Sequence, residues 1–220
     1  MAYFPFMQNI DGKSFLVVGT GKIALRKIRF ILQFTDHITV ITHHTDPAEL
    51  TAGKEEEFSG IRILDREFLP EDLQNTDYCI ASSDDKEDNR WIAQLCRWAD
   101  IPVNVPDDPS QCTFFLPAAI VRGDLTIAVS TGGKSPALSR YLRKTIEESI
   151  PTDIEAVLDR MGELREWIPN HFSDSAQRKS IYSTVMQSLL NGQIAPAREE
   201  VESFTNHIIQ RYKKQNNSNE

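Results

Sequence analysis

The stretch Phe15-Leu16-Val17-Val18-Gly19-Thr20-Gly21-Lys22-Ile23-Ala24 decides the fold. An apolar run leads into the pattern G-x-G-x-x-A, and a helical pattern follows it, as in a strand that turns directly into a helix. Gly19 permits the tight turn, Gly21 lets the backbone approach a pyrophosphate, and the small Ala24 lets the helix pack on the strand. The unpaired N–H groups at the start of such a helix suit phosphate. The stretch therefore predicts a dinucleotide-binding turn, against the alternative of a glycine-rich turn without a ligand.

Around this turn, short β-rich runs alternate with helical patterns as far as Val105. The alternation predicts an α/β fold with a Rossmann-type parallel sheet, covered by helices on both faces. The expected strands are 14–18, 37–42, 61–68, 78–82 and 102–105, and the expected helices are 23–34 and 88–99.

Beyond this sheet the pattern changes. Residues 113–121 and 125–130 flank the turn dipeptide Gly123-Asp124 and predict a strand pair. A helix is expected over about 136–150, and from residue 152 onward the pattern is wholly helical.

Length and pattern together predict three parts. A chain of 220 residues is enough for one sizeable α/β domain with an appended piece. We expect a dinucleotide-binding domain over 1–112, a small strand-pair and helix segment over 113–150, and a C-terminal all-helical domain over 151–220.

The composition excludes several classes of protein. Hydrophobic residues make up 40% of the chain and charged residues 25%, and no run of about 18 apolar residues predicts a membrane span. The N-terminus lacks the basic flank of a secretory signal, so the cytoplasm is the expected location. A net charge of −8 argues against broad nucleic-acid affinity. The three cysteines, Cys79, Cys96 and Cys112, are far apart, and we expect neither a disulfide nor a zinc site.

The end of the second strand bears on the choice of cofactor. It reads Thr42-His43-His44, where many NAD-binding folds place an acid for the ribose hydroxyls. No arginine stands there for a 2′-phosphate either, so NAD is favoured over NADP. The two histidines either contact the adenosine half or are exposed loop residues.

Two loops at the carboxyl ends of strands carry acidic residues, and ligands of open α/β sheets bind at these ends. Ser82-Ser83-Asp84-Asp85 either faces the cofactor or caps the next helix. Asn104-Val105-Pro106-Asp107-Asp108-Pro109 would hold a carboxylate near the nicotinamide, where it could take a proton as hydride leaves. Taken alone, the second loop fits turn-forming aspartates better.

A third loop, Ser130-Thr131-Gly132-Gly133-Lys134-Ser135, combines hydroxyls, glycines and a lysine before a predicted helix. Its spacing is not that of a nucleotide P-loop, so ATP binding is not supported. Its amides and Lys134 suit carboxylates. The competing interpretation is helix entry without a ligand.

Taken in order, five motifs resemble the precorrin-2 dehydrogenases of siroheme synthesis, including the dehydrogenase and ferrochelatase module of siroheme synthase. The first reads V-G-T-G-K-I-A-L-R-K, where that family typically has V-G-G-G-x-V-A-x-R-K. Thr20 thus replaces the usual middle glycine. The five matching segments are 18–27, 81–85 with Asn89, 104–109, 114–119 and 130–136.

The resemblance implies NAD-dependent oxidation of precorrin-2 to sirohydrochlorin, which some members follow with insertion of ferrous iron. It places the important aspartate of the N-V-x-D-x-P motif at Asp107 rather than Asp108. It also implies a homodimer made by the middle segment. The same resemblance places Lys22, Ile23, His43 and His44 at the cofactor. Together with the turn and loop residues above, the residues expected to bind NAD are Gly19, Thr20, Gly21, Lys22, Ile23, His43, His44, Ser83 and Asp84. Those expected to bind the substrate's carboxylates are Ser130, Thr131, Gly132, Gly133, Lys134 and Ser135.

Two alternatives stay open at this point. Sequence does not separate a pure dehydrogenase from one that also inserts iron, because no metal-ligand cluster decides the matter. A module that binds NAD to regulate a partner is the rival from another class, and it would need neither Asp107 nor the loop 130–136.

Overall fold

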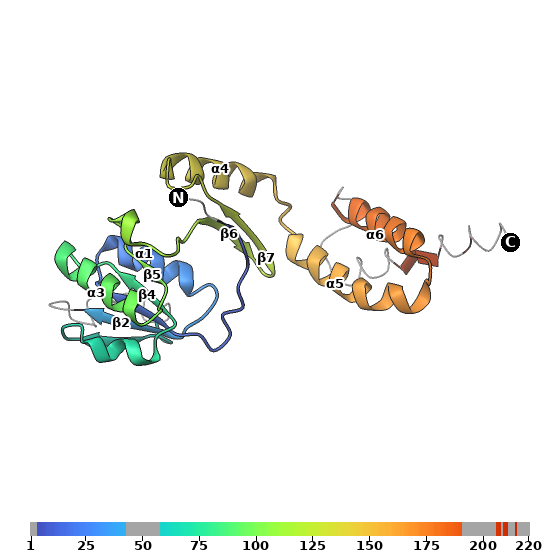
Figure 1. The fold of residues 1–220 in the computed structure, drawn as a ribbon. Coiled ribbons are helices and arrows are strands. Elements are labelled where there is room, and N and C mark those ends of the chain that lie inside the picture. Colours follow the sequence, from blue (N-terminus) through green and yellow to red (C-terminus); the bar gives the residue numbers. More distant parts are fainter. Residues whose placement is uncertain (1–3, 43–57, 191–205, 208, 211–213, 215–220) are drawn as a thin grey trace. The chain divides into compact units, whose positions relative to one another are not determined.

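The computed structural model describes residues 4–42, 58–190, 206–207, 209–210 and 214. The chain forms two compact units, Met1–Leu116 and Pro117–Glu220 (Figure 1). The finer three-part division at residues 112 and 150 stays a prediction.

The first unit is built on a parallel sheet of five strands. In chain order these are β1 (Phe15–Val18), β2 (Ile38–Thr42), β3 (Arg62–Asp65), β4 (Tyr78–Ala81) and β5 (Val103–Asn104). Their order in space is β3-β2-β1-β4-β5, and every pair is parallel. This arrangement confirms the predicted Rossmann-type sheet, and it brings the loops after β1, β4 and β5 to one edge.

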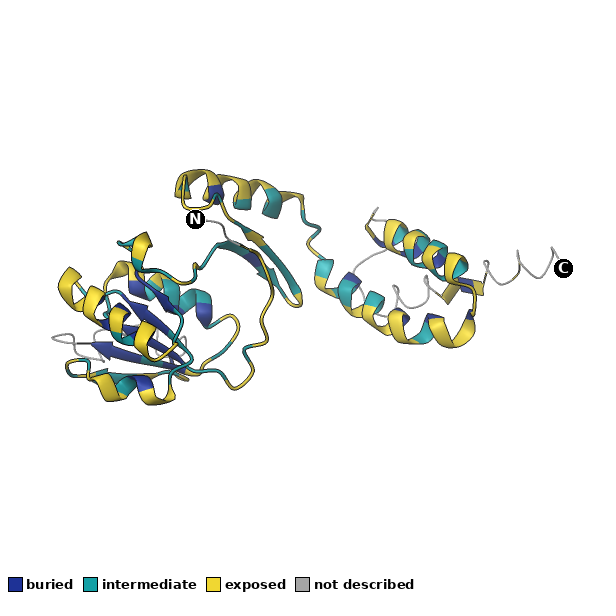
Figure 2. Ribbon diagram, in the orientation of Figure 1, coloured by how far each residue is buried: buried dark blue, intermediate teal, exposed yellow. Residues whose placement is uncertain are grey.

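Successive side chains of a strand point to opposite faces of the sheet, and helices cover both faces. On one face Leu16 and Val18 pack with residues of helix α3 (Lys86–Trp98), such as Ile92. On the other, Val17 packs with helix α1 (Lys22–Ile31). All four residues of β1 are buried, and the central strands of the parallel sheet are dark blue in Figure 2. Two 3₁₀ turns complete the unit, η1 (Pro70–Asn75) and η2 (Pro109–Gln111).

The predicted strand over 113–121 is wrong in its first half, because β6 begins only at Ala118. Thr113 and Phe114 lie along β5 instead. The Thr113 amide donates to the Val103 carbonyl at 2.8 Å, and the Val103 amide donates to Thr113 Oγ1 at 2.7 Å. These bonds occupy the edge of β5, so this segment belongs to the first unit.

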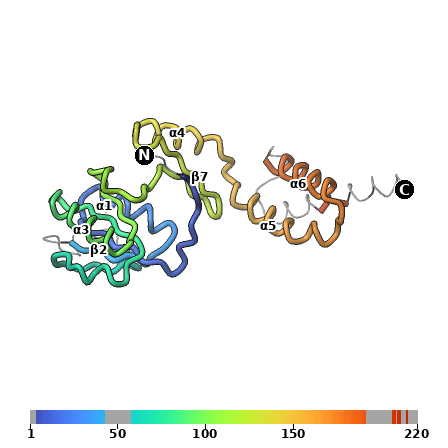
Figure 3. Tube along the Cα trace, viewed as in Figure 1, coloured from blue at the N-terminus to red at the C-terminus, as the bar shows by residue number. Residues whose placement is uncertain are grey.

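The second unit begins with the predicted strand pair. β6 (Ala118–Arg122) and β7 (Leu125–Val129) are antiparallel and joined at Gly123, whose φ is +52°. Helix α4 (Pro136–Ser149) follows, then α5 (Ile154–His171) and α6 (Ser175–Leu190), as Figure 3 traces. The last two helices share a buried core that contains Val157, Leu164, Ile168, Ile181 and Val185. In the described part of the chain, no helix is long and apolar enough to cross a membrane.

Candidate functional site

The turn after β1 is fixed by backbone packing. Gly19 has a φ of +106°, and its amide donates to the Ile41 carbonyl at 2.8 Å. A Cβ on Gly19 would lie 2.2 Å from the Ser82 carbonyl oxygen and 2.8 Å from the Ser83 amide nitrogen. No side chain fits in that space. The turn after β1 and the loop after β4 therefore touch through their backbones.

Gly21 has a different environment. It is the N-cap residue of α1, with φ −63°, and no side chain described in the structure caps the helix there. A Cβ on Gly21 would meet only Asp84 Oδ1, at 3.9 Å. The chain itself thus gives no steric reason for a glycine. Lys22 and Ile23 are exposed, so the first N–H groups of α1 are accessible to an anion.

The Thr20 side chain points back toward the sheet. Its hydroxyl lies 3.3 Å from the hydroxyl of Thr42, which is 1% exposed. A threonine is therefore compatible with the turn, because only its backbone needs to face a ligand. The predicted contacts His43 and His44 lie outside the described residues.

The loop after β4 is held by Asn89, a residue of α3 that is 1% exposed. Asn89 Oδ1 accepts from the Ser83 amide at 2.9 Å, and Asn89 Nδ2 donates to the Ser83 carbonyl at 2.9 Å. The Ser83 hydroxyl donates to Asn89 Oδ1 as well, at 3.0 Å. Ser83 is thereby fixed beside the turn at Gly19.

The two acids of this loop have different roles. Asp85 is the N-cap of α3 and accepts from the amides of Glu87 at 2.7 Å and Asp88 at 3.4 Å. The cap interpretation is therefore confirmed for Asp85, and it explains why α3 begins two residues earlier than predicted. Asp84 is exposed and lies near Gly21, so it is the acid of the pair that can face a ligand at the turn.

The loop after β5 also carries two acids, and only one of them is used by the fold. Asp108 caps η2, and its Oδ1 accepts from the Ser110 hydroxyl at 2.5 Å and from the Ser110 amide at 3.2 Å. The Ser110 hydroxyl and amide lower the pKa of Asp108, and the charge of Arg90, 3.7 Å away, adds to this effect. Asp107 is exposed and accepts no hydrogen bond from any described residue. The turn interpretation thus applies to Asp108 and leaves Asp107 available.

The same loop is closed by a cysteine thiol that sequence reasoning did not single out. Cys112 Sγ lies 3.2 Å from both the amide nitrogen and the carbonyl oxygen of Val105, and 3.7 Å from the Asp108 carbonyl oxygen. Burial raises the pKa of Cys112, so the thiol keeps the proton that it donates. Asn104 is 2% exposed, and its Nδ2 donates to the Phe114 carbonyl at 2.9 Å. Position in the sequence gives no sign of these contacts.

Lys27, on α1, provides a pH-dependent prediction. Burial, together with the charge of Arg26, lowers the pKa of Lys27 from 10.5 to about 8, and Cys112 partly opposes this shift. The folded state therefore binds fewer protons than the unfolded state between pH 8 and 10.5, and this lysine makes stability rise with pH across that window. Lys27→Met is expected to raise the free energy of unfolding at pH 7 by about 2 kcal/mol, with most of the gain gone at pH 10. Urea denaturation of both proteins at the two pH values measures this change in the free energy of unfolding.

The matched control is Lys22→Met, which removes an exposed lysine from the same helix. A Lys27→Met protein that is less stable than the wild type at both pH values would contradict the assignment.

In the second unit, the loop before α4 is shaped partly by its own hydroxyls. Thr131 Oγ1 accepts from the Ser135 amide at 3.1 Å and lies 3.1 Å from the Ser139 hydroxyl. Ser135 caps α4 by accepting from the Leu138 amide at 3.2 Å. Both side chains therefore shape the entry to α4.

The rest of this loop is open. Gly132 and Gly133 have φ of +60° and +81°, and a Cβ on either would meet nothing within 4 Å. Ser130 Oγ accepts from the Gly132 amide at 3.2 Å. Lys134 is exposed and forms no ion pair with a described residue. These groups could still receive a carboxylate.

Metal ligands are not grouped in the described part of the chain, where no three His, Cys, Asp or Glu side chains are placed to share an ion. The three cysteines are free thiols.

Taken together, the sheet order, the glycine turn and the open start of α1 define a Rossmann-type nucleotide-binding protein. Residues 6–118 match the family described as "Putative NAD(P)-binding". The chain belongs to this family. Residues 122–149 match a second family, described as "Sirohaem biosynthesis protein central".

Similar proteins agree with both matches. The chain is 36% identical over 187 residues to a siroheme synthase of Nitrosomonas eutropha, covering 85% of this chain and 39% of that protein. It is 34% identical over 212 residues to siroheme synthase 3 of Aeromonas hydrophila, covering 93% of this chain and 44% of that protein. The chain thus spans about two fifths of these relatives. A solved structure described as "SirC, precorrin-2 dehydrogenase" shares the fold, with a TM-score of 0.71 and 24% identity over 96% of this chain and 100% of that one.

Proposed function

We propose that this protein is an NAD-dependent precorrin-2 dehydrogenase, which oxidises precorrin-2 to sirohydrochlorin with release of one hydride and one proton. The observation that carries the proposal lies within the first unit. An open helix start at Gly21 and an uncommitted carboxylate at Asp107 follow β1 and β5, whose carboxyl ends lie at the same edge of the sheet. The names of the relatives, siroheme synthase and precorrin-2 dehydrogenase, support the choice of substrate.

The residues around the turn fit the pyrophosphate of a dinucleotide. The backbone at Gly21, Lys22 and Ile23 offers N–H groups at the positive end of α1. We assign cofactor contacts to Gly19, Thr20, Gly21, Lys22, Ile23, Ser83 and Asp84, and to His43 and His44. NAD is favoured over NADP because no arginine follows β2 at Thr42 to receive a 2′-phosphate. NAD, when bound, supplies the hydride acceptor.

We assign to Asp107 the uptake of the proton that the substrate loses during oxidation. An exposed carboxylate without a hydrogen-bond donor among the described residues is free to accept one from a ligand. Precorrin-2 must lose a proton from its macrocycle as hydride departs, and Asp107 receives it. If ferrous iron is inserted afterwards, the same carboxylate takes part in removing the pyrrole N–H protons.

The loop before α4 is assigned to the acidic side chains of the substrate. Gly132 and Gly133 leave their surroundings open, and Lys134 supplies a cation. We assign the binding of substrate carboxylates to Ser130, Thr131, Gly132, Gly133, Lys134 and Ser135.

A homodimer and a cytoplasmic location complete the proposal. β6 and β7 form a sheet of only two strands, and α4 exposes Leu138, Tyr141 and Leu142, so a second copy would cover apolar surface in this segment. Sedimentation at micromolar concentration tests the dimer, and a monomer there would remove it. Three free thiols suit a reducing compartment.

The decisive experiment is anaerobic incubation of the purified protein with precorrin-2 and NAD, followed by NADH and tetrapyrrole absorbance, and then addition of ferrous iron. NADH together with sirohydrochlorin is the expected result, and siroheme formed faster than without protein would add the iron-insertion step. Measurable NAD binding without any NADH would favour a regulatory NAD-binding module instead.

A further inference from the structure

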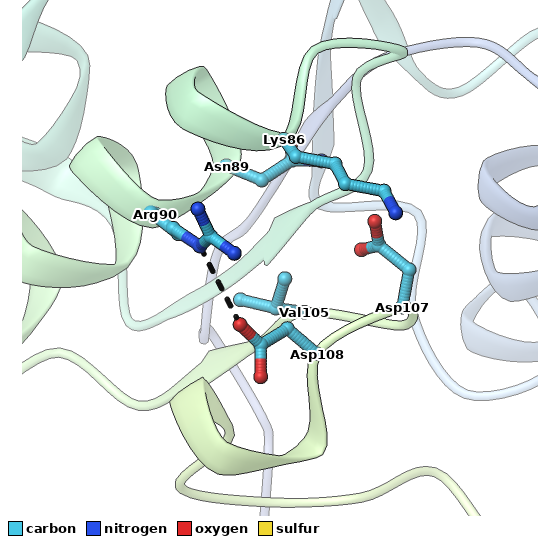
Figure 4. Close-up of a pocket in the computed structure, with 6 residues that line it drawn as sticks. All are labelled: Lys86, Asn89, Arg90, Val105, Asp107 and Asp108. Carbon is cyan, nitrogen blue, oxygen red and sulfur yellow. Dashed lines mark ion pairs between the residues drawn. The ribbon is translucent and has the colours of Figure 1, made fainter.

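A pocket of about 220 Å³ opens beside Asp107, at the carboxyl end of β5. It is lined by Lys86, Asn89, Arg90, Val105, Asp107 and Asp108. Figure 4 shows the two cations reaching from the first turns of α3 toward the two carboxylates of the loop, with Val105 between them. Val105 is 1% exposed, so the floor of the pocket is a buried apolar side chain.

Two of the four charged side chains that line the pocket, Arg90 and Asp108, are already paired. Arg90 Nη1 lies 2.6 Å from Glu87 Oε1, and Arg90 Nε lies 3.7 Å from Asp108 Oδ2. Asp108 Oδ1 also accepts a hydrogen bond from the Ser110 hydroxyl. Lys86, in contrast, forms no hydrogen bond or ion pair with a described residue. Its ammonium group points toward the Asp107 carboxylate in Figure 4, and the two do not come close enough to form an ion pair.

Helix α3 itself does not favour a lysine at this position. Lys86 is the first residue of α3, where the helix dipole disfavours a cation. It also stands one turn before Arg90, and like charges four residues apart destabilise a helix by a few tenths of a kcal/mol. A carboxylate delivered by a ligand would remove both disadvantages.

We propose that Lys86 binds a peripheral carboxylate of a substituted tetrapyrrole whose ring faces Asp107. A ligand that lies between the two groups must offer an acceptor to Lys86 and a donor or acidic hydrogen to Asp107. Pyrroles with acetate and propionate side chains offer both. Asn89 is tied to Ser83, so Lys86 is the group of α3 that is free to select the acidic substituent. This assignment rests on the proposed function and names a further residue that recognises its substrate.

The test compares Lys86→Met and Lys86→Arg with Arg62→Met, which removes a cation from β3 at the opposite edge of the sheet. Uroporphyrin III is the binding probe, because it is stable and carries acetate and propionate groups. Lys86→Met is expected to weaken uroporphyrin binding and to raise the KM for precorrin-2 about tenfold, since a hydrogen bond between charged groups contributes about 1.5 kcal/mol. The KM for NAD stays the same and the thermal midpoint does not fall, Lys86→Arg recovers most of the loss, and Arg62→Met behaves as wild type.

Two results would overturn the assignment. If Lys86→Met binds uroporphyrin as well as the wild type does, Lys86 does not contact the tetrapyrrole. If only NAD binding is weakened, Lys86 lies at the cofactor instead. The proposed function fails separately. If the wild-type protein binds uroporphyrin through Lys86 but forms no NADH from precorrin-2, the role of Lys86 is supported and the proposed dehydrogenase activity is contradicted.

Discussion

Gly19→Ala is expected to lower the free energy of unfolding by about 3 kcal/mol or more. The new Cβ would lie 2.2 Å from the Ser82 carbonyl oxygen, and the obstacle is backbone, which cannot rotate away. Crowding of this kind costs about 1–3 kcal/mol. The φ of +106° adds strain of about 1–2 kcal/mol for any L side chain. A drop in thermal midpoint on the order of 15 °C, or loss of soluble protein, is the expected measurement.

Gly21→Ala is the matched variant, because it adds the same methyl group two residues away. Gly21 has a φ that alanine adopts, and the new Cβ would meet only Asp84 Oδ1 at 3.9 Å. Its thermal midpoint should stay close to wild type, while the affinity for NAD, measured by calorimetric titration, falls at least tenfold. A Gly21→Ala protein that binds NAD normally would contradict the pyrophosphate position, and a stable Gly19→Ala protein would contradict the contact with Ser82.

Asp107→Asn is expected to lower kcat by about 10²–10⁴-fold, the range typical of losing a general base. The amide has nearly the shape of the carboxylate but cannot take the proton. Asp107 makes no hydrogen bond with the described chain, so neither the thermal midpoint nor the affinity for NAD should change. NADH formation in a single turnover with precorrin-2 measures the effect.

Asp108→Asn separates the two acids. This change weakens the cap of η2 and the ion pair with Arg90, so it should lower the thermal midpoint slightly while most of the turnover remains. If Asp108→Asn abolished turnover and Asp107→Asn did not, Asp108 would be the residue that takes the proton.

The sheet was predictable because its signals are local. The apolar run of β1, the glycine turn and the amphipathic pattern of α1 follow each other directly in the sequence, and the observed parallel sheet agrees with the prediction. The predicted strand from residue 113 failed because an apolar run does not reveal which neighbour it contacts. Thr113 pairs with Val103, and the sequence pattern does not show that the loop between them folds back onto β5.

The candidate site was predictable only to the level of its loops. The sequence pattern placed acids after β4 and β5 but did not by itself decide between adjacent residues, because both members of each pair suit a turn. The family resemblance alone selected Asp107 over Asp108. The choice depends on which side chain the backbone turns toward its own amides, as it does for Asp85 and Asp108. Lys86 gave no signal at all, because its position is informative only beside the loop that carries Asp107.

The loop that presents Asp107 makes most of its bonds to itself. Cys112 bonds both sides of Val105, the Gln111 amide donates to the Asp108 carbonyl at 3.0 Å, and the Cys112 amide donates to Pro109 at 3.3 Å. Such a segment behaves as one structural unit. Exchanging residues 104–114 as a whole with those of a relative should preserve the position of Asp107. Replacing Cys112 alone would remove its hydrogen bonds to Val105, to which the rest of the loop is fitted.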